Sequence, residues 1–167
     1  MMSKYFEFLR QTDIFYQLAP EYISMIAGLC KEVTLDSGEV IFPEGIGSGE
    51  LYIILDGTVE IQVNPGLVSD EPEKEHIPVT ISTLRRGQSF GEIALVDKGM
   101  RSASALAGVD NTRLLVIDRD RLIHLCDDHP VLGYRLMYNL AADLALKMRG
   151  SGLRIREELL YSSRSTS

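Results

Sequence analysis

Residues Phe90–Ser104 read FGEIALVDKGMRSAS, and this stretch decides both the fold class and the expected chemistry. Gly91 allows the backbone to approach another group closely. Residues 92–95 predict one helical turn, whose unpaired N–H groups and dipole attract an anion. Arg101 adds a planar, permanently charged guanidinium that suits phosphate oxygens. Because Glu92 accepts hydrogen bonds from hydroxyl donors, the whole stretch predicts a site for a sugar phosphate.

Short β-rich runs separated by glycine turns surround this stretch, from residue 33 to residue 117. The clearest pair is 51–55 and 58–63, and the Asp-Gly at 56–57 between them predicts a tight type I′ hairpin. The acidic, proline-containing segment 64–78 predicts a solvated insertion at a hairpin tip, with a partner-binding loop as the alternative. Many short antiparallel strands at regular spacing predict a roll or barrel over 33–117.

Helical periodicity flanks the strands on both sides. Residues 1–32 predict an N-terminal helical segment, residues 118–161 predict C-terminal helices, and residues 162–167 predict a flexible tail. The longest helix is expected from Val131 to Arg149, with Gly150–Gly152 stopping or hinging it. Because this helix is apolar around most of its circumference, it needs cover on more than one side. We therefore expect the roll on one side and a second copy of the chain on the other.

The composition is that of an ordinary globular protein. The chain has 167 residues, 45% of them hydrophobic, with a formal net charge of −7. This length suits one domain with its own core, and the acidic balance argues against direct nucleic-acid binding. No apolar run is long enough for a membrane span, and the N-terminus lacks a signal pattern. Cys30 and Cys126 lie far apart in apolar patterns, so we expect free thiols and a cytoplasmic location.

The pattern at 90–104 resembles the phosphate-binding cassette of cyclic nucleotide-binding domains, the family of the catabolite activator and of the protein kinase A regulatory subunit. The shared features are a Phe-Gly-Glu-aliphatic-Ala-Leu opening and Arg101 nine residues after Glu92. Upstream, residues 42–45 and 51–60 are similar to the early strands of the family. The resemblance implies a mainly β fold: an antiparallel β-roll (double-stranded β-helix, or jelly roll) with N-terminal helices and a long C-terminal helix.

The resemblance also implies a role for each position of the cassette. Glu92 would accept a hydrogen bond from the ribose 2′-hydroxyl, and Arg101 would pair with the cyclic phosphate. The backbone N–H groups expected to line the phosphate and ribose are those of Gly91, Ile93, Ala94, and Ser102 or Ala103.

Recognition of the base is expected from two sides. Val59, Ile61 and Leu84 are apolar candidates for one wall, and residues 147–149 lie about where the family supplies a cap over the purine. At the position of Ser102, cGMP-selective kinase domains have Thr, and bacterial members with Ser bind cAMP. We therefore expect cAMP as the ligand, with cGMP as the alternative, and no metal cofactor.

These features favour a regulatory sensor over an enzyme. Ligand binding is expected to re-seat the C-terminal helix, which would pass the signal to a protein effector or to a second copy. A metal-dependent enzyme on a similar barrel needs clustered ligands, but His76, His124 and His129 do not form such a cluster in the sequence.

Three other interpretations stay open. In the first, the chain is the ligand-binding part of a longer transcription regulator. Such a regulator needs a helix-turn-helix module after the long helix, and the residues after Gly152 are too few to form one. In the second it is a degenerate fold that acts as a protein-interaction module. In the third, Arg101 and Glu92 form only an internal ion pair.

Overall fold

The computed structural model describes residues 4–68, 70, 76–97 and 99–164 of the chain. The strands in this part are β1 (Lys31–Leu35), β2 (Val40–Phe42), β3 (Glu50–Asp56), β4 (Thr58–Val63), β5 (Val79–Arg85), β6 (Ser89–Phe90), β7 (Ser104–Ala107) and β8 (Thr112–Asp118). The helices are α1 (Phe6–Arg10), α2 (Pro20–Leu29), α3 (Ile93–Asp97), α4 (Arg119–Asp128) and α5 (Pro130–Arg164), with short 3-10 turns η1 (Asp13–Phe15) and η2 (Pro65–Val68).

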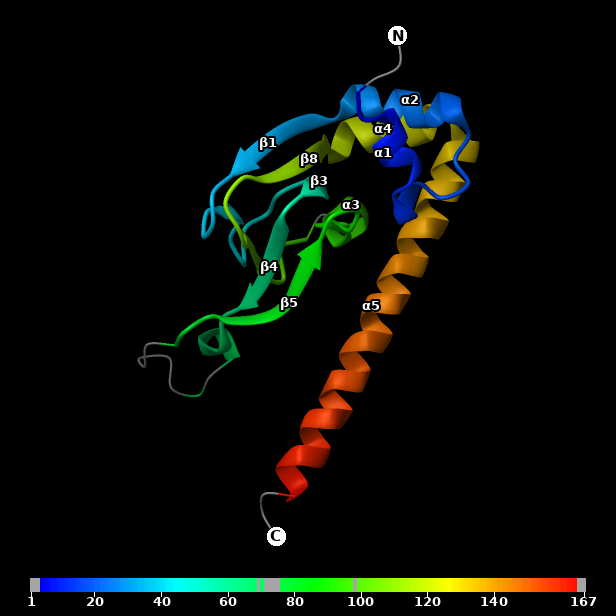
Figure 1. The fold of residues 1–167 in the computed structure, drawn as a ribbon. Coiled ribbons are helices and arrows are strands. Elements are labelled where there is room, and N and C mark those ends of the chain that lie inside the picture. Colours follow the sequence, from blue (N-terminus) through cyan, green and yellow to red (C-terminus); the bar gives the residue numbers. More distant parts are fainter. Residues whose placement is uncertain (1–3, 69, 71–75, 98, 165–167) are drawn as a thin grey trace.

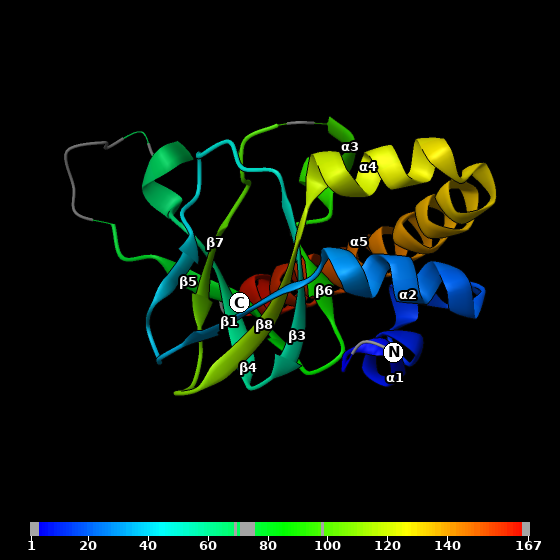
Figure 2. The ribbon, with the colours of Figure 1, turned by 90° about the horizontal axis from the view of Figure 1, so that it is seen from above.

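The strands form two four-stranded sheets, in the orders β1-β8-β3-β6 and β2-β7-β4-β5. Every pairing is antiparallel. Helices α1, α2 and α4 gather at one end of the two sheets, and α5 runs from that end alongside the roll (Figure 1). From above, α1, α2 and α4 lie to one side of the strands, and the C-terminal part of α5 passes behind them (Figure 2). This confirms the predicted jelly roll with N-terminal helices and a long C-terminal helix.

The predicted β-hairpin around residues 56–57 is wrong. β3 pairs with β6 and β8, whereas β4 pairs with β5 and β7, so the two strands belong to different sheets. Gly57 has a φ of +84°. Asp56 has no positive φ, since in the described part of the chain only Gln17 and Asn111 among the non-glycine residues do. Asp56 therefore does not adopt the conformation that a type I′ turn requires. The chain turns a corner at Gly57 and passes from one sheet to the other.

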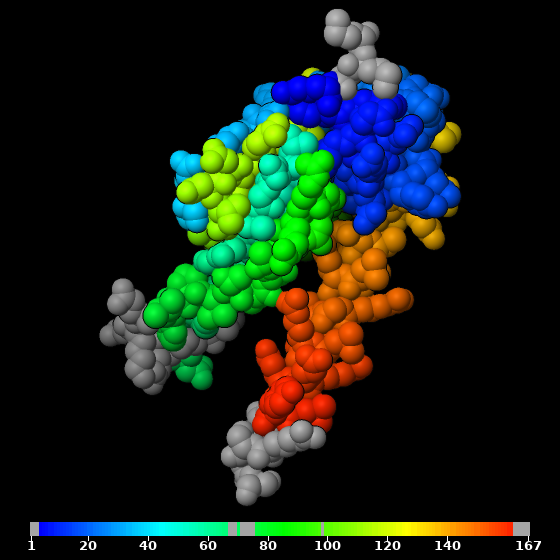
Figure 3. Space-filling model, viewed as in Figure 1, coloured from blue at the N-terminus to red at the C-terminus, as the bar shows by residue number. Residues whose placement is uncertain are grey.

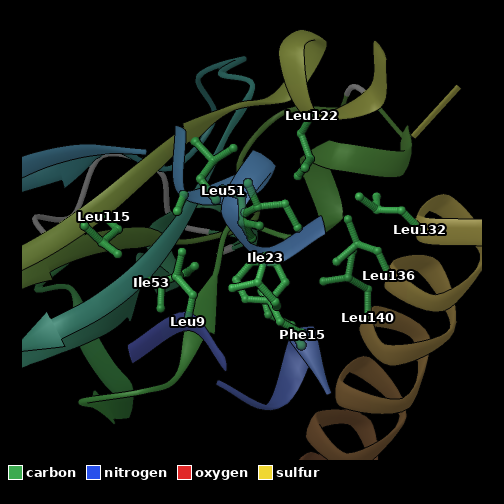
Figure 4. Close-up of a cluster of buried hydrophobic side chains, with 14 of the residues drawn as sticks. Leu9, Phe15, Ile23, Leu51, Ile53, Leu115, Leu122, Leu132, Leu136 and Leu140 are labelled. Atoms are coloured by element: carbon green, nitrogen blue, oxygen red, sulfur yellow. The ribbon is translucent and has the colours of Figure 1, made fainter. Parts of the chain in front are cut away.

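The burial of β3 explains why β3 and β4 belong to different sheets, because the two faces of β3 pack into two different cores. Leu51 and Ile53 face the core between the first sheet and the helices, where Phe15, Leu136 and Leu140 also pack (Figure 4). The side chains of the second core lie between the two sheets and include Tyr52, Ile54, Val59, Phe90 and Leu114. A strand buried on both faces needs a layer on each, and a simple two-stranded hairpin does not provide that.

Helix α5 is continuous, so the predicted stop at Gly150–Gly152 is wrong. A glycine inside a helix costs only about 1 kcal/mol relative to alanine. Lys147 and Arg154, on either side of these glycines, both hydrogen-bond to the roll, and these contacts help to offset that cost. Of the tail predicted at 162–167, the backbone of 162–164 is helical, and 165–167 lie outside the described residues.

A helix cap and a predicted hairpin tip complete the fold. Asp118 caps α4 by accepting a hydrogen bond from the Arg121 N–H at 2.9 Å. Segment 64–78 joins β4 to β5, whose register pairs Val63 with Val79, so it closes the tip of a hairpin. Residues 69 and 71–75 of that segment lie outside the described residues. None of the helices described is long and apolar enough to cross a membrane.

Candidate functional site

The stretch 90–104 folds around a close backbone approach at Gly91. Its φ is +79°, which favours glycine. A Cβ atom at this position would lie 2.7 Å from Nη1 of Arg101 and 2.9 Å from the carbonyl oxygen of Glu50. The predicted helical turn follows as α3, which begins at Ile93. Gly91 thus lets α3 begin directly beside the guanidinium group of Arg101.

Arg101 is buried, with only 4% of its side chain exposed, and three hydrogen bonds hold its guanidinium group. Its Nε donates to Oγ of Ser48 at 2.7 Å, Nη1 to the carbonyl oxygen of Gly91 at 3.0 Å, and Nη2 to that of Glu50 at 2.9 Å. The guanidinium also lies 4.2 Å from the ring centre of Phe42. Burial lowers the pKa of Arg101, but an arginine stays charged in proteins. The site therefore holds a fixed, buried positive charge.

Glu92 is also buried and has a different cation as its partner. Its Oε1 accepts a hydrogen bond from Nζ of Lys147 on α5 at 2.6 Å. Lys147 donates as well to the carbonyl oxygen of Ser89 at 2.9 Å and forms an ion pair with Asp143 at 2.8 Å. Burial alone would lower the pKa of Lys147, but the two carboxylates outweigh burial and raise it. The internal Glu92–Arg101 ion pair considered from the sequence is therefore wrong, because the two side chains have other partners.

A cavity of about 750 Å³ opens between the roll and α5. In the space-filling view, the surface is hollowed between β5, in green, and the C-terminal part of α5, in red (Figure 3). All the cassette residues singled out from the sequence line this cavity: Gly91, Glu92, Ile93, Ala94, Arg101, Ser102 and Ala103.

The three residues expected to wall the base differ in where they lie. Ile61 and Leu84 line the cavity, as expected. Val59 lies on the same face of β4 as Ile61 but is fully buried in the second core, and it is not among the cavity-lining residues. In the expected cap region, Lys147 lines the cavity, whereas Met148 and Arg149 are not among its lining residues.

Sequence reasoning missed the C-terminal part of α5. Ser151, Arg154, Ile155 and Glu158 line the cavity, and Arg154 donates a hydrogen bond to the carbonyl oxygen of Ile81 on β5. Their spacing continues the helical face of Lys147. The signal was present in the sequence, but ending the helix at Gly150 hid it. Ser48 and Glu50, which accept hydrogen bonds from Arg101 just before and at the start of β3, had no such signal in the sequence.

The cavity combines three kinds of recognition. Arg101 offers a buried cation for an anionic group, Glu92 offers an acceptor for hydroxyl donors, and Ile61, Leu84 and Ile155 offer apolar surface for a flat ring. In the part of the chain that the structure describes, no group of His, Cys, Asp or Glu side chains has the arrangement of a metal site. The chemistry is that of binding an anionic, hydroxyl-bearing molecule with an apolar portion.

The family comparison agrees with this geometry. The family model for the cyclic nucleotide-binding domain matches residues 32–129, more than half of the chain. The chain belongs to this family, so the fold and the cavity together define a regulatory cyclic nucleotide-binding domain.

Relatives of the chain include a cyclic AMP receptor protein and a cGMP-dependent protein kinase. The chain is 31% identical to the cyclic AMP receptor protein of Thermus thermophilus, covering 88% of this chain and 62% of that protein. It is 30% identical to human cGMP-dependent protein kinase 2, over 71% of this chain and 15% of the kinase. The chain thus spans less than two thirds of the length of either relative.

Solved structures show the same fold. The Thermus thermophilus catabolite activator protein superposes with a TM-score of 0.70 at 30% identity, covering 87% of this chain and 62% of that one. A putative cyclic nucleotide-binding protein from Geobacter metallireducens gives a TM-score of 0.70 at 27% identity, covering 89% of this chain and 99% of that one.

Proposed function

We propose that the chain binds cAMP in the cavity between the cassette and α5 and that this binding sets the position of α5. The observation that carries the proposal is the buried guanidinium of Arg101, which lines the cavity together with the carboxylate of Glu92. Arg101 pairs with the cyclic phosphate, and Glu92 accepts from the ribose 2′-hydroxyl. Gly91, Ile93, Ala94, Ser102 and Ala103 line the same ligand. The chain itself acts as a non-enzymatic sensor.

The base lies between β4–β5 and the cavity face of α5 in this proposal. Ile61 and Leu84 supply apolar contact from the roll, and Ser151 and Ile155 supply contact from the helix. Preference for cAMP over cGMP rests on Ser102, which lines the cavity beside Arg101. The name of the Thermus relative, a cyclic AMP receptor, supports the same choice.

Signal output is proposed to run through α5 to a second copy of the chain. Large apolar side chains on α5 are exposed, among them Tyr134, Tyr138 and Met148. Ala141 and Ala145 lie between them on the same face and are also exposed. Small residues flanked by large apolar ones allow two helices to approach closely. A homodimer along this face would make the position of α5 the signal that other proteins detect.

A cytoplasmic location fits the two thiols. Cys30 and Cys126 are free, and burial raises the pKa of Cys30 to about 12 and that of Cys126 to about 11. Both are therefore protonated and unreactive at neutral pH. Free thiols of this kind, one buried and one half-buried, are typical of a reducing compartment.

Calorimetric titration with cAMP and cGMP tests the proposal. Arg101→Ala is expected to weaken binding by about 2–5 kcal/mol, as loss of one partner of a buried charge pair does. Arg113→Ala is the matched control, because Arg113 pairs with Glu32 rather than lining the cavity. Glu92→Gln provides a second cavity variant if Arg101→Ala unfolds. Absence of binding by folded wild-type protein would overturn the proposal and favour a degenerate domain.

A further inference from the structure

We infer that Lys147 is a positioning residue that aims Glu92 at a ribose hydroxyl and ties that recognition to α5. The inference rests on the proposed binding of a cyclic nucleotide. It concerns a residue of the long helix, outside the cassette, that contacts a cassette side chain directly. On this inference, the chain distinguishes a ribose from a 2′-deoxyribose because Lys147 positions Glu92.

The ammonium group of Lys147 joins three separate parts of the molecule. It donates to Oε1 of Glu92 in the cassette at 2.6 Å and to the carbonyl oxygen of Ser89 in β6 at 2.9 Å. On α5 itself it is paired with Asp143 at 2.8 Å. Two partners on the roll and one on the helix fix the ammonium in place. Because the lysine side chain is flexible when free, these contacts give it one defined position.

This contact determines which oxygen of Glu92 is available. Lys147 engages Oε1, so Oε2 is the acceptor left for a ligand hydroxyl. The side chain of Glu92 is only 7% exposed. Lys147 therefore holds Glu92 in one orientation, with Oε2 directed to the ligand.

The same contact links recognition to the helix. Arg154, two turns further along α5, reaches the carbonyl oxygen of Ile81 on β5, so Lys147 and Arg154 hold this part of α5 over the cavity from both sides. Of the two, only Lys147 touches a residue proposed to contact the ribose. If Glu92 loses its cation, the hydroxyl contact and the anchoring of α5 weaken together.

The test compares the binding of cAMP with that of 2′-deoxy-cAMP, which lacks the hydroxyl. Wild-type protein is expected to prefer cAMP by about tenfold or more, the usual effect of a hydrogen bond to a charged group. Lys147→Met keeps the length and helix propensity of the side chain, and the preference is expected to fall towards one. Lys147→Arg is expected to restore part of it. Arg149→Met is the matched control on the same helix and should keep the wild-type ratio.

A purely structural role for Lys147 predicts a different result. Lys147→Met would then weaken both nucleotides by the same factor, and the ratio would stay at the wild-type value; that outcome overturns the inference. Equal binding of the two nucleotides by the wild type also overturns it, while leaving nucleotide binding itself intact.

Hydrogen exchange in the nucleotide-free protein tests the link to α5 separately. Amides at 147–158 are expected to exchange faster in Lys147→Met than in the wild type or in Arg149→Met. Unchanged protection contradicts the inference. If the wild type binds neither nucleotide, the proposed function fails, and this exchange experiment still decides whether Lys147 anchors α5.

Discussion

Gly57 lies directly against Thr112 at the corner where the chain passes between the two sheets. A Cβ atom on Gly57 would lie 2.6 Å from Oγ1 and 2.9 Å from Cα of Thr112. Thr112 is fully buried, and its hydroxyl donates to the carbonyl oxygen of Val109 at 2.8 Å. It therefore has no room to move aside. The corner of the roll requires a residue without a side chain at this point.

Gly57→Ala is expected to lower the free energy of unfolding by about 2–4 kcal/mol, from left-handed strain together with the clash. Gly87→Ala is the matched control, because Gly87 has the same φ of +84° and no atom within 4 Å of an added Cβ. That variant should show the strain alone. Urea unfolding of the two variants gives the comparison, and equal losses would contradict the role of Thr112.

Glu32 makes stability depend on pH in the acidic range. Its carboxylate accepts from the Tyr5 hydroxyl at 2.6 Å, from Lys4 at 3.0 Å and from Arg113 at 2.7 Å. These contacts lower the pKa of Glu32 from 4.5 to about 2. The stabilisation is therefore complete above pH 4.5 and is lost as the pH falls towards 2.

Glu32→Gln is expected to be less stable than the wild type at pH 7 and to lose less stability on acidification. Urea unfolding from pH 7 to pH 2 measures the difference. Glu7→Gln serves as the control, since Glu7 pairs with Arg10 at 3.4 Å and both side chains are exposed. Parallel pH profiles for wild type and Glu32→Gln would rule out this contribution.

Asn139 anchors the first half of α5 to the N-terminal segment. Its Nδ2 donates to the carbonyl oxygens of Ile14 at 3.0 Å and Tyr16 at 2.8 Å. Asn139→Ala leaves these oxygens without that donor, at an expected cost of about 1–3 kcal/mol. Arg135→Ala, one turn earlier on the same helix, should change stability little. Thermal unfolding measures both, and a neutral Asn139→Ala variant would contradict the anchoring role.

Ser102 is the position proposed to influence the choice of base. Ser102→Thr keeps the hydroxyl and adds a methyl group, as at the corresponding position of cGMP-selective kinase domains that the cassette resembles. It is expected to raise the affinity for cGMP relative to cAMP. Competition binding gives the ratio. Ser104→Thr is the control, because Ser104 does not line the cavity. Its Oγ accepts a hydrogen bond from the Glu44 N–H at 2.9 Å. The same ratio in all three proteins would remove Ser102 from base selection.

The exposed face of α5 makes a prediction about oligomeric state. The wild type is expected to scatter light as a dimer, with twice the 18.6 kDa mass of the chain. Ala145→Glu and Tyr138→Glu place a charge on that face and should give a monomer. Ser24→Glu, on the exposed side of α2, should remain dimeric. A monomeric wild type, or a dimer that survives both variants, contradicts this interface.

Much of the candidate site was readable from local sequence. The close approach at Gly91, the turn that becomes α3 and the charges of Glu92 and Arg101 depend on residue type and short spacing, which a sequence displays directly. All of these residues line one cavity. The partners of the two charged groups were not readable, because Ser48 and Lys147 come from distant parts of the chain.

The errors in the fold have a common origin. A tight hairpin at 56–57 and a helix stop at Gly150 both follow from local preferences of glycine. In each place a tertiary contact outweighs the local preference: strand pairing with β8 at the corner, and the contacts of Lys147 and Arg154 with the roll along α5. Val59 was misplaced because apolar alternation places it on the same buried face of β4 as Ile61 but does not show where along that face the cavity lies.

The sequence by itself determined the family, the jelly-roll class and the identity of the cassette residues, because periodicity, turn chemistry and spacing act over a few neighbouring residues. Tertiary structure alone decided which strands pair, how far α5 continues and that Glu92 meets Lys147 rather than Arg101. Those outcomes depend on the simultaneous burial of several surfaces and on the pairing of charges far apart in the chain, and only the closed roll with α5 beside it brings these groups together.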